Sequence, residues 1–358
     1  MGDPGVRIIA VVGMHRSGTS VVTRGLQVMG VELGSRLMPP FAGNNSKGFW
    51  EDIDINTLNI EMLHSLKSDW HFLAPIQPEE VDTLCRNGYL QRALELLQVK
   101  TTGVQLFGFK DPRVAKMLPF WKKVFAQAQA KIDYVVVIRH PLSVCQSLAK
   151  RDGFDFEKSY LLWLDHVIGS LVGTEGEDRV LVDYDLLIQE PDSEITRIAK
   201  GLKLSINTAD LEKFKTEFLD RELRHTTYQL HELTLDNAAP PLVREIYSSL
   251  LELAAHNSSL QEVTLKNKTG QWNKEFIRMR SMLVLADKLG SRITTISAER
   301  NALSSERDAL LAENARVLQA LREKEQVAQK LTNETLAIYR SRSWRWTAPL
   351  RRLLTFFR

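Results

Sequence analysis

The sequence predicts an α/β fold, in which helices flank a parallel sheet and a helical extension and a coiled coil follow. Four short apolar runs, each typical of a strand buried on both faces, alternate with stretches whose apolar residues recur at helical spacing. Strands that alternate with helices favour a parallel sheet covered by helices. Beyond residue 282 the apolar residues instead recur every seven positions, which indicates a coiled coil.

Each element of the expected α/β part follows from its local pattern. The strands are continuous apolar runs, expected at residues 7–12, 106–109, 134–138 and 179–182. The helices have apolar residues three or four positions apart and are expected at residues 19–29, 54–66, 114–129, 142–150, 157–172 and 193–202. These patterns stop near residue 227, so we expect the α/β domain to span residues 1–227.

Three further segments follow the α/β domain. Residues 228–281 contain helix-like stretches, such as residues 242–253 after a Pro-Pro breaker, but no strand pattern, so we expect a helical extension. The coiled coil is expected over residues 282–338, and a basic aromatic tail over residues 339–358.

The coiled-coil segment has two core columns that differ in their content of apolar residues. One column is almost wholly apolar and comprises Leu289, Ile296, Leu303, Leu310, Val317, Lys324, Leu331 and Ile338. The other is largely polar and comprises Ile293, Arg300, Arg307, Asn314, Leu321, Ala328 and Thr335. A polar residue such as Asn314 in a core column favours a parallel two-stranded coil at a cost in stability. We therefore expect a homodimer, with a single solvated helix as the alternative.

Composition limits the classes of function. The chain has 358 residues and is 44% hydrophobic, which is ample for a buried core. Its formal charge of +3 is small, so nucleic acid is not an expected partner. Cys85 and Cys145 lie far apart in the sequence with no metal-ligand spacing around them, which indicates reduced thiols and no metal site. No apolar run is long enough for a signal sequence or a membrane span, so we expect a cytoplasmic protein.

A glycine-rich stretch, GMHRSGTS at residues 13–20, joins the first expected strand to the first expected helix. Such a turn presents backbone N–H groups and the positive end of a helix dipole to an anion. Arg16 adds a cation, and three residues add hydroxyl groups: Ser17, Thr19 and Ser20. The Gly-Lys pair of the magnesium-dependent nucleotide loop is missing. A tight turn without a ligand is the alternative.

A second basic stretch follows the third expected strand. Arg139 ends that strand, Pro141 begins a helix, and Ser147 lies eight residues after the arginine. Arg139 and Ser147 together are able to bind a second phosphate group at some distance from the first.

These two stretches resemble the sulfotransferases that use 3′-phosphoadenosine 5′-phosphosulfate (PAPS). Residues 13–20 resemble the 5′-phosphosulfate loop of the carbohydrate sulfotransferases, in which Arg replaces Lys, and residues 139–147 resemble the 3′-phosphate motif. The resemblance covers about residues 7–227 and implies a P-loop-like sheet, PAPS as co-substrate and no metal. The cofactor-binding residues that it implies are His15, Arg16, Ser17, Gly18, Thr19, Ser20, Arg139 and Ser147.

Three residues are expected to act in catalysis. Arg16 is expected to stabilise the charge that develops on the departing phosphate, because a guanidinium stays charged and does not readily donate a proton. Glu51, in a Gly-Phe-Trp-Glu segment similar to one in bacterial members of the family, is a candidate general base. The alternative is that Glu51, Asp52 or Asp54 only caps the following helix.

The stretch GFKDPR at residues 108–113 also resembles a family segment. An N-cap followed by proline explains Asp111 and Pro112 without any chemistry. Lys110 and Arg113 are not explained in this way, and we expect one of them, with Lys110 as the choice, to face the sulfonate or an anionic acceptor. A later Gly-x-Trp stretch superficially resembles a nucleotide-covering segment, but Trp272 is more simply a packing residue.

The tail combines six arginines with aromatic residues and contains no acidic residue, which is typical of a segment that lies on an anionic bilayer. It also resembles the C-terminal tails of bacterial enzymes that build surface polysaccharides. A nucleic-acid-binding arm and an unstructured end are the alternatives. We therefore expect a cytoplasmic protein that is peripheral on the inner face of the membrane.

The motifs together predict a bacterial PAPS-dependent sulfotransferase. Its expected acceptor is a carbohydrate hydroxyl, in a surface glycan or its lipid-linked precursor. Two alternatives remain: a non-catalytic coiled-coil scaffold of a polysaccharide assembly complex, and an ATP-dependent kinase.

Overall fold

The computed structural model describes residues 5–41, 47–219, 228–255 and 263–356. Four parallel strands form one sheet in the order β2-β1-β3-β4: β1 (Arg7–Gly13), β2 (Leu106–Lys110), β3 (Lys131–Ile138) and β4 (Asp178–Asp183). Ala10 of β1 lies opposite Phe109 of β2 and Tyr134 of β3. The α/β fold class predicted from the sequence is confirmed, and β3 begins three residues before its expected start.

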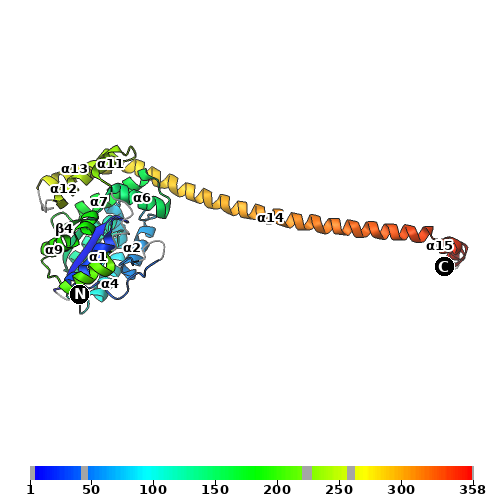
Figure 1. Ribbon diagram of the computed structural model, residues 1–358, viewed down its shortest axis with the longest axis horizontal. Coiled ribbons are helices and arrows are strands. Elements are labelled where there is room, and N and C mark those ends of the chain that lie inside the picture. The colour runs from blue at the N-terminus through cyan, green and yellow to red at the C-terminus, as the bar shows by residue number, and fades with distance from the viewer. Residues whose placement is uncertain (1–4, 42–46, 220–227, 256–262, 357–358) are drawn as a thin grey trace. The chain divides into compact units, whose positions relative to one another are not determined.

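Helices connect the parallel strands, because each return to the same end of a sheet needs a crossover (Figure 1). The six expected helices are present as α1 (Thr19–Leu26, extended by the short turn η1, Gln27–Met29), α2 (Ile53–Ser65), α5 (Val114–Ala128), α6 (Pro141–Asp152), α7 (Phe156–Gly173) and α9 (Pro191–Leu202). Five further short elements were not predicted: α3 (Pro78–Arg86), α4 (Tyr89–Thr101), α8 (Tyr184–Gln189), α10 (Thr208–Lys213) and η2 (Phe214–Phe218).

The sheet is buried on both faces. Side chains along β1 alternate between two hydrophobic clusters: Ile8 and Ala10 belong to the larger cluster and Ile9 and Val11 to the smaller one. The continuous apolar run of β1 therefore reflects two covered faces. Of the two free cysteines, Cys145 is buried in the larger cluster and Cys85 is half-buried beside it.

The segment after residue 227 packs onto the α/β part. Its helices are α11 (Leu230–Leu235), α12 (Pro241–Ala255) and α13 (Val263–Arg278). Trp272 is only 1% exposed and belongs to the larger hydrophobic cluster, as expected for a packing residue. Its indole Nε1 donates to Glu245 at 2.8 Å. The described residues up to Asp287 form one compact unit.

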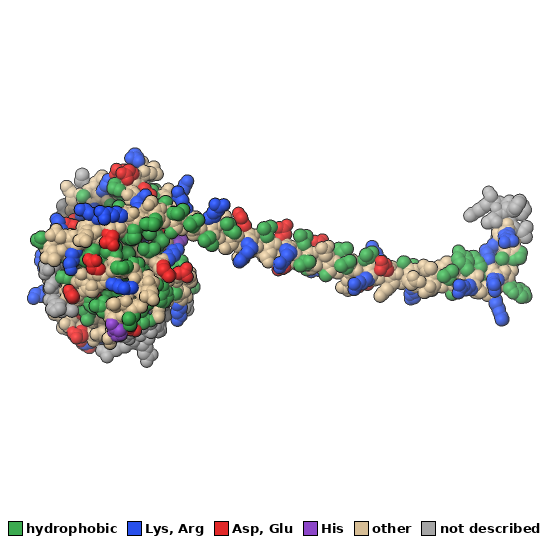
Figure 2. Space-filling model, turned by 90° about the horizontal axis from the view of Figure 1, so that it is seen from above, with side chains coloured by type: hydrophobic (Ala, Val, Ile, Leu, Met, Phe, Trp, Pro, Cys, Tyr) green, Lys and Arg blue, Asp and Glu red, His purple; other side chains and the backbone are tan. Residues whose placement is uncertain are grey.

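The second unit, residues 288–358, is helical where the structure describes it. α14 runs without interruption over Arg280–Arg340, so it begins two residues before the predicted coiled-coil segment and ends two residues after it. α15 (Arg342–Trp346) and α16 (Ala348–Phe356) follow in the tail. Hydrophobic side chains lie at the surface of this unit between charged ones of both signs (Figure 2). Among the described helices, none combines the length and the apolar character that a membrane span needs.

Candidate active site

The loop between β1 and α1 is built on two glycines. At Gly13 a Cβ atom would lie 2.5 Å from the carbonyl oxygen of Val137 on the neighbouring strand. Gly18, the N-cap of α1, has a φ of 83°, and a Cβ there would collide with the ring of Tyr184. Arg16 between them also has a positive φ, of 67°. Side chains at the two glycines are excluded, so the loop backbone lies directly against β3 and Tyr184.

The two basic stretches of the sequence meet beside this loop. Arg16 Nε donates to Ser147 Oγ at 2.7 Å, and Arg139 Nη1 donates to the backbone oxygen of Arg16 at 3.1 Å. The Arg139 guanidinium also lies 4.6 Å from the centre of the Tyr184 ring. Parallel β1 and β3 are neighbours in the sheet, so their carboxyl ends bring Arg16 and Arg139 together.

Glu51 and Asp52, adjacent in the sequence, have different roles. Asp52 is the N-cap of α2: its Oδ1 accepts from the backbone N–H groups of Asp54 and Ile55 at 3.0 and 3.1 Å. Lys100 Nζ lies 2.6 Å from Oδ2 of Asp52, so the cap also forms an ion pair. Glu51 therefore does not cap the helix, and its side chain lines the cavity described below.

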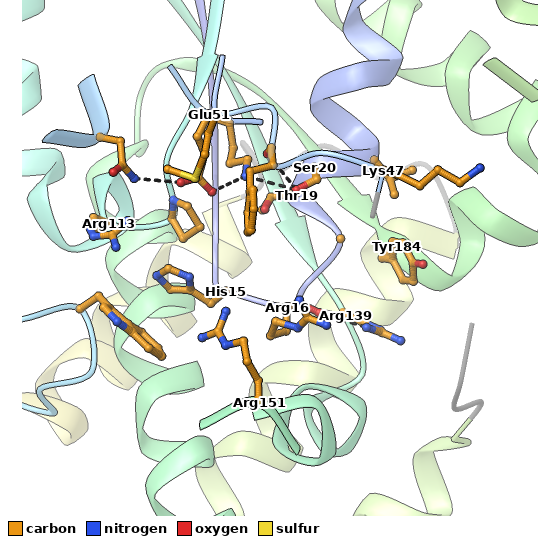
Figure 3. Close-up of a pocket in the computed structure, with 18 of the residues that line it drawn as sticks. His15, Arg16, Thr19, Ser20, Lys47, Glu51, Arg113, Arg139, Arg151 and Tyr184 are labelled. Carbon is orange, nitrogen blue, oxygen red and sulfur yellow. Dashed lines mark hydrogen bonds and ion pairs between the residues drawn. The ribbon is translucent and has the colours of Figure 1, made fainter. Parts of the chain in front are cut away.

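The Glu51 carboxylate pairs with Lys110, from the end of β2. Lys110 Nζ donates to Glu51 Oε1 at 2.6 Å and also to Ser20 Oγ at 3.3 Å, as the dashed lines in Figure 3 show. Asn56 donates to the other oxygen, Oε2, at 2.9 Å. Burial raises the pKa of Glu51, while the positive charge of Lys110 opposes the rise. Lys110 itself is only 2% exposed, so this is an ion pair removed from bulk water.

Asp111 is fully buried but is not the N-cap that the sequence suggested. α5 begins at Val114 with Arg113 as its capping residue, and Asp111 Oδ1 instead accepts from the backbone N–H and the guanidinium of Arg113 at 2.9 and 3.0 Å. Asn59 Nδ2 donates to Oδ2 of Asp111 at 3.0 Å. A cap at Asp111 would place the first helical residue at Pro112, so α5 begins two residues later than such a cap would imply.

These groups line one cavity of about 550 Å³ in the globular unit. Six cationic side chains line it, namely Arg16, Lys47, Lys110, Arg113, Arg139 and Arg151, against two carboxylates, Glu51 and Asp152. Figure 3 shows Arg113 on one side of the cavity and Arg139 and Tyr184 on the other, with His15 and Arg16 between them. The excess of positive charge suits an anionic ligand.

His15 is a neutral group in this positive surrounding. It is 9% exposed, and burial, followed by the charge of Arg113, lowers the pKa of its imidazole well below the usual value. Its ring centre lies 4.2 Å from that of Trp70. Nε2 of His15 has no hydrogen-bond partner among the described residues.

The model of the sulfotransferase family matches residues 9–208, more than half of the chain. The chain belongs to the sulfotransferase family. This family match covers β1 to β4 and therefore includes both basic stretches and the Glu51–Lys110 pair.

Solved sulfotransferase structures give distant matches. The sulfotransferase domain of the olefin synthase from Synechococcus PCC 7002 is 15% identical, with a TM-score of 0.39 and coverage of 69% of this chain and 96% of that one. The sulfotransferase domain from the curacin biosynthetic pathway is 16% identical, with a TM-score of 0.37 and coverage of 60% and 78%. Sulfotransferase STF1 from Mycobacterium tuberculosis H37Rv is 13% identical, with a TM-score of 0.37 and coverage of 68% and 76%. The comparison with curated proteins gave no match.

Not all of the residues predicted for this sulfotransferase site face the cavity in the same way. The cavity is lined directly by His15, Arg16, Gly18, Thr19, Ser20, Glu51, Lys110 and Arg139. Ser147 reaches it through its hydrogen bond with Arg16, and the Ser17 side chain is fully buried in the loop.

Sequence reasoning missed several residues that line the cavity. Among them are Lys47, Asn56, Trp70, Arg151 and Tyr184, and Asn56 also donates to Glu51. Asn56 had a usable signal, because a polar residue at an otherwise apolar helical position, one turn after the cap, is unusual. The other four come from segments whose local patterns do not mark a site.

Proposed function

We propose that this sulfotransferase transfers a sulfuryl group from PAPS to a hydroxyl group of a carbohydrate, in a bacterial surface glycan or its precursor. The observation that carries the proposal is the buried Glu51–Lys110 pair, in the same cavity as the anion-binding loop after β1. Sulfuryl transfer needs a group that accepts the hydroxyl proton and cations for the charge that leaves. The cavity offers both kinds of group.

The donor half of the cavity has groups that an anion would satisfy. Nε of Arg139 is buried and has no hydrogen-bond partner within the described part of the chain. The N-terminus of α1 adds backbone N–H groups and the positive end of its dipole. We place the 5′-phosphosulfate at the loop of residues 16–20 and the 3′-phosphate at Arg139 and Ser147. The donors at these two places suit the two anionic groups of PAPS.

The proposed step is a direct displacement at sulfur. The acceptor oxygen forms a bond to sulfur as the bond between sulfur and the 5′-phosphate oxygen breaks, and Glu51 takes the hydroxyl proton. The products are a sulfate ester and 3′,5′-adenosine bisphosphate (PAP). Arg16 stabilises the charge that grows on the departing oxygen, so it acts more strongly on the transition state than on the bound donor. Burial raises the pKa of Glu51, which makes it a stronger base than an exposed carboxylate.

The acceptor half is proposed to lie on the side of His15, Trp70 and Arg113. The neutral imidazole of His15 has an unpartnered buried Nε2 that is able to bond a sugar hydroxyl. Trp70 and Arg151 line the same side, with the guanidinium 5.1 Å from the Trp70 ring centre. An aromatic surface with a few fixed polar groups suits a sugar ring. The resemblance to carbohydrate sulfotransferases supports the same acceptor class.

The second unit is proposed to dimerise the enzyme and to attach it to an anionic membrane. The apolar side chains of its core columns are exposed, for instance Leu303 at 65% and Leu310 at 54%. An isolated helix gains stability mainly by packing an apolar face, so a second copy is the expected partner. In the tail, Trp346 is 86% exposed and Arg351 lies 3.7 Å from the centre of the Trp344 ring.

A thermal-shift comparison tests the donor assignment. Purified protein is heated with PAP and, separately, with ATP and magnesium. A ligand that binds only the native state stabilises it by about 2.7 kcal/mol at a hundredfold excess over Kd. We expect PAP to raise the melting temperature and ATP with magnesium to have little effect. A shift with ATP and magnesium alone would support a kinase, and no shift with either would support a scaffold.

A further inference from the structure

Near its N-terminal end, here called its base, the long helix α14 is bonded through one carboxylate to the segment that carries part of the cavity wall. Asp287, in the second turn of α14, accepts hydrogen bonds from two consecutive backbone N–H groups: Leu73 to Oδ1 at 2.7 Å and Ala74 to Oδ2 at 2.9 Å. More than two hundred residues of sequence separate the partners. Hydrogen bonds from backbone N–H to an ionised carboxylate are about twice as strong as neutral ones.

The segment that Asp287 holds has no helix or strand of its own. Residues 66–77 connect α2 to α3 through turns, in which Phe72 N–H for example donates to the backbone oxygen of Asp69. The two N–H groups that donate to Asp287 depend instead on a partner from another element. Lys116 supplies one contact, because its Nζ donates to the backbone oxygen of Phe72 at 2.8 Å. Leu73 is 5% exposed and belongs to the larger hydrophobic cluster. Asp287 therefore satisfies two N–H groups at the point where the segment enters the core.

The same segment carries part of the cavity wall. Trp70 lines the cavity and lies against His15, with ring centres 4.2 Å apart. It also contacts the guanidinium of Arg151, from the end of α6. In Figure 3, His15 and Arg151 lie apart from Tyr184 and Lys47, which line the opposite side. A displacement of residues 73 and 74 would thus move the side of the cavity that faces away from Tyr184.

α14 is itself anchored at this point. Leu283, one turn before Asp287, is 4% exposed and belongs to the larger hydrophobic cluster. Beyond Leu283 no side chain that the structure describes is buried. Asp287 is also the last residue of the compact unit. The first two turns of α14 are therefore a structural part of the globular unit.

We propose that Asp287 is a positioning residue that fixes the Trp70 wall of the acceptor half. The base of α14 then supports acceptor binding, while the proposed donor contacts of Arg16, Arg139 and Ser147 do not depend on it. This inference rests on the proposed function, because it uses the division of the cavity into a donor half and an acceptor half.

The test compares three full-length variants, each with PAP bound. D287N keeps the shape of the side chain but removes its charge and one acceptor oxygen, D287E restores the carboxylate, and D308N removes an exposed carboxylate from the same helix as the matched control. Hydrogen exchange is measured peptide by peptide. The accessibility of Trp70 to acrylamide is measured as the fluorescence difference between each protein and its W70F counterpart.

We expect D287N to exchange at least tenfold faster in residues 66–77 and to expose Trp70, with D287E close to the parent and D308N indistinguishable from it. PAP affinity should change less than twofold. Unchanged exchange and Trp70 accessibility in D287N would overturn the inference. So would faster exchange throughout the sheet, because Asp287 would then serve general stability. Failure of the parent to bind PAP would count against the proposed function instead, and would be seen before any variant is compared.

Discussion

The globular unit and the helical unit of this sulfotransferase differ in how far their charged and apolar side chains are buried. In the globular unit even charged groups are buried with partners: Lys110 is 2% exposed and Asp111 0%. In the helical unit no described side chain is buried, and the ion pair of Arg307 with Asp308 lies at the surface, where such pairs contribute little. The first unit buries its apolar side chains within one chain, whereas the second exposes an apolar stripe.

The largest expected effect is on turnover and lies wholly within the globular unit. Glu51→Gln keeps the shape of the side chain but cannot accept the proton, so turnover should fall by about 100- to 10,000-fold while PAP affinity stays near the parental value. Glu61→Gln, at an exposed carboxylate paired with Arg92, is the control. Initial rates with labelled PAPS measure the effect. Parental turnover in the Glu51 variant would leave Glu51 as a partner of Lys110 without a role as base.

The pH dependence of turnover is a second test of Glu51 as the general base. A base must be deprotonated, so turnover should fall as pH decreases through the pKa of Glu51. Burial raises that pKa above the ordinary value of 4.5, so the loss should begin at a higher pH than for an exposed glutamate. A flat profile over the acidic range would indicate another base, with His15 as the next candidate.

The next effect is on donor affinity. Arg139→Ala should weaken PAP binding by about ten- to a hundredfold, because a charge-assisted contact of about 1.5 to 3 kcal/mol is lost. Ser147→Ala should have a smaller effect, and Ser143→Ala, one turn earlier on α6, is the control. Calorimetric titration with PAP measures all three. Parental affinity in both the Arg139 and Ser147 variants would show that the 3′-phosphate site is elsewhere.

In the helical unit, by contrast, substitution of exposed residues should have an effect, and the effect should be on the oligomeric state of the protein. The double variant Leu303→Glu and Leu310→Glu should halve the solution mass, since it places charges in the apolar core column of a coil. Ser305→Glu, outside both columns, should remain dimeric. Light scattering gives the mass. A truncation after residue 290 should also be monomeric and still bind PAP, because it keeps Leu283 and Asp287. A dimer that survives both changes would place the interface in the globular unit.

The tail should bind anionic vesicles. Each arginine near such a surface contributes about 1 kcal/mol, and salt screens this attraction over a Debye length of about 8 Å. The aromatic side chains should leave a salt-resistant remainder. Co-sedimentation of the full chain and of a chain that ends at Ile338, with neutral and anionic lipid at two salt concentrations, measures both parts. The membrane role is wrong if the two chains sediment equally, and stronger retention by nucleic acid would favour a basic arm.

The smallest expected effect is on stability at Asp183, the N-cap of α8. Burial raises its pKa to about 7, so the folded state binds a proton that the unfolded state, with a pKa near 3.8, releases first. Stability from this group is therefore present at low pH and is lost as pH rises from about 4 to 7. Asp183→Asn keeps the cap and should raise the melting temperature by a few degrees at pH 8 and by less at pH 5. An equal change at both pH values would contradict this.

Local patterns were sufficient for the strands, the six main helices and the loop, because these depend on residues close together in the chain. The glycine-bounded apolar run and the basic residues after it were enough to predict an anion site at residues 13–20. The helices α3 and α4, which pack against α5, were missed, although Leu90, Ala93, Leu94 and Leu97 of α4 do recur at helical spacing. The dimer, the tail and the acceptor remain predictions, because each depends on a partner outside the chain.

The sequence by itself determined which groups are available for chemistry, and the tertiary structure decided which of them act together. Glu51 and Lys110 lie 59 positions apart, and they meet because the chain just before the N-cap of α2 lies beside the carboxyl end of β2. Only the structure shows that Asp52 accepts the first backbone N–H groups of α2, whereas Glu51 pairs with Lys110. Trp70, Arg151 and Asp287 carry no local signal at all. Strand order and side-chain packing are cooperative properties of the whole unit, so no short stretch of sequence contains them.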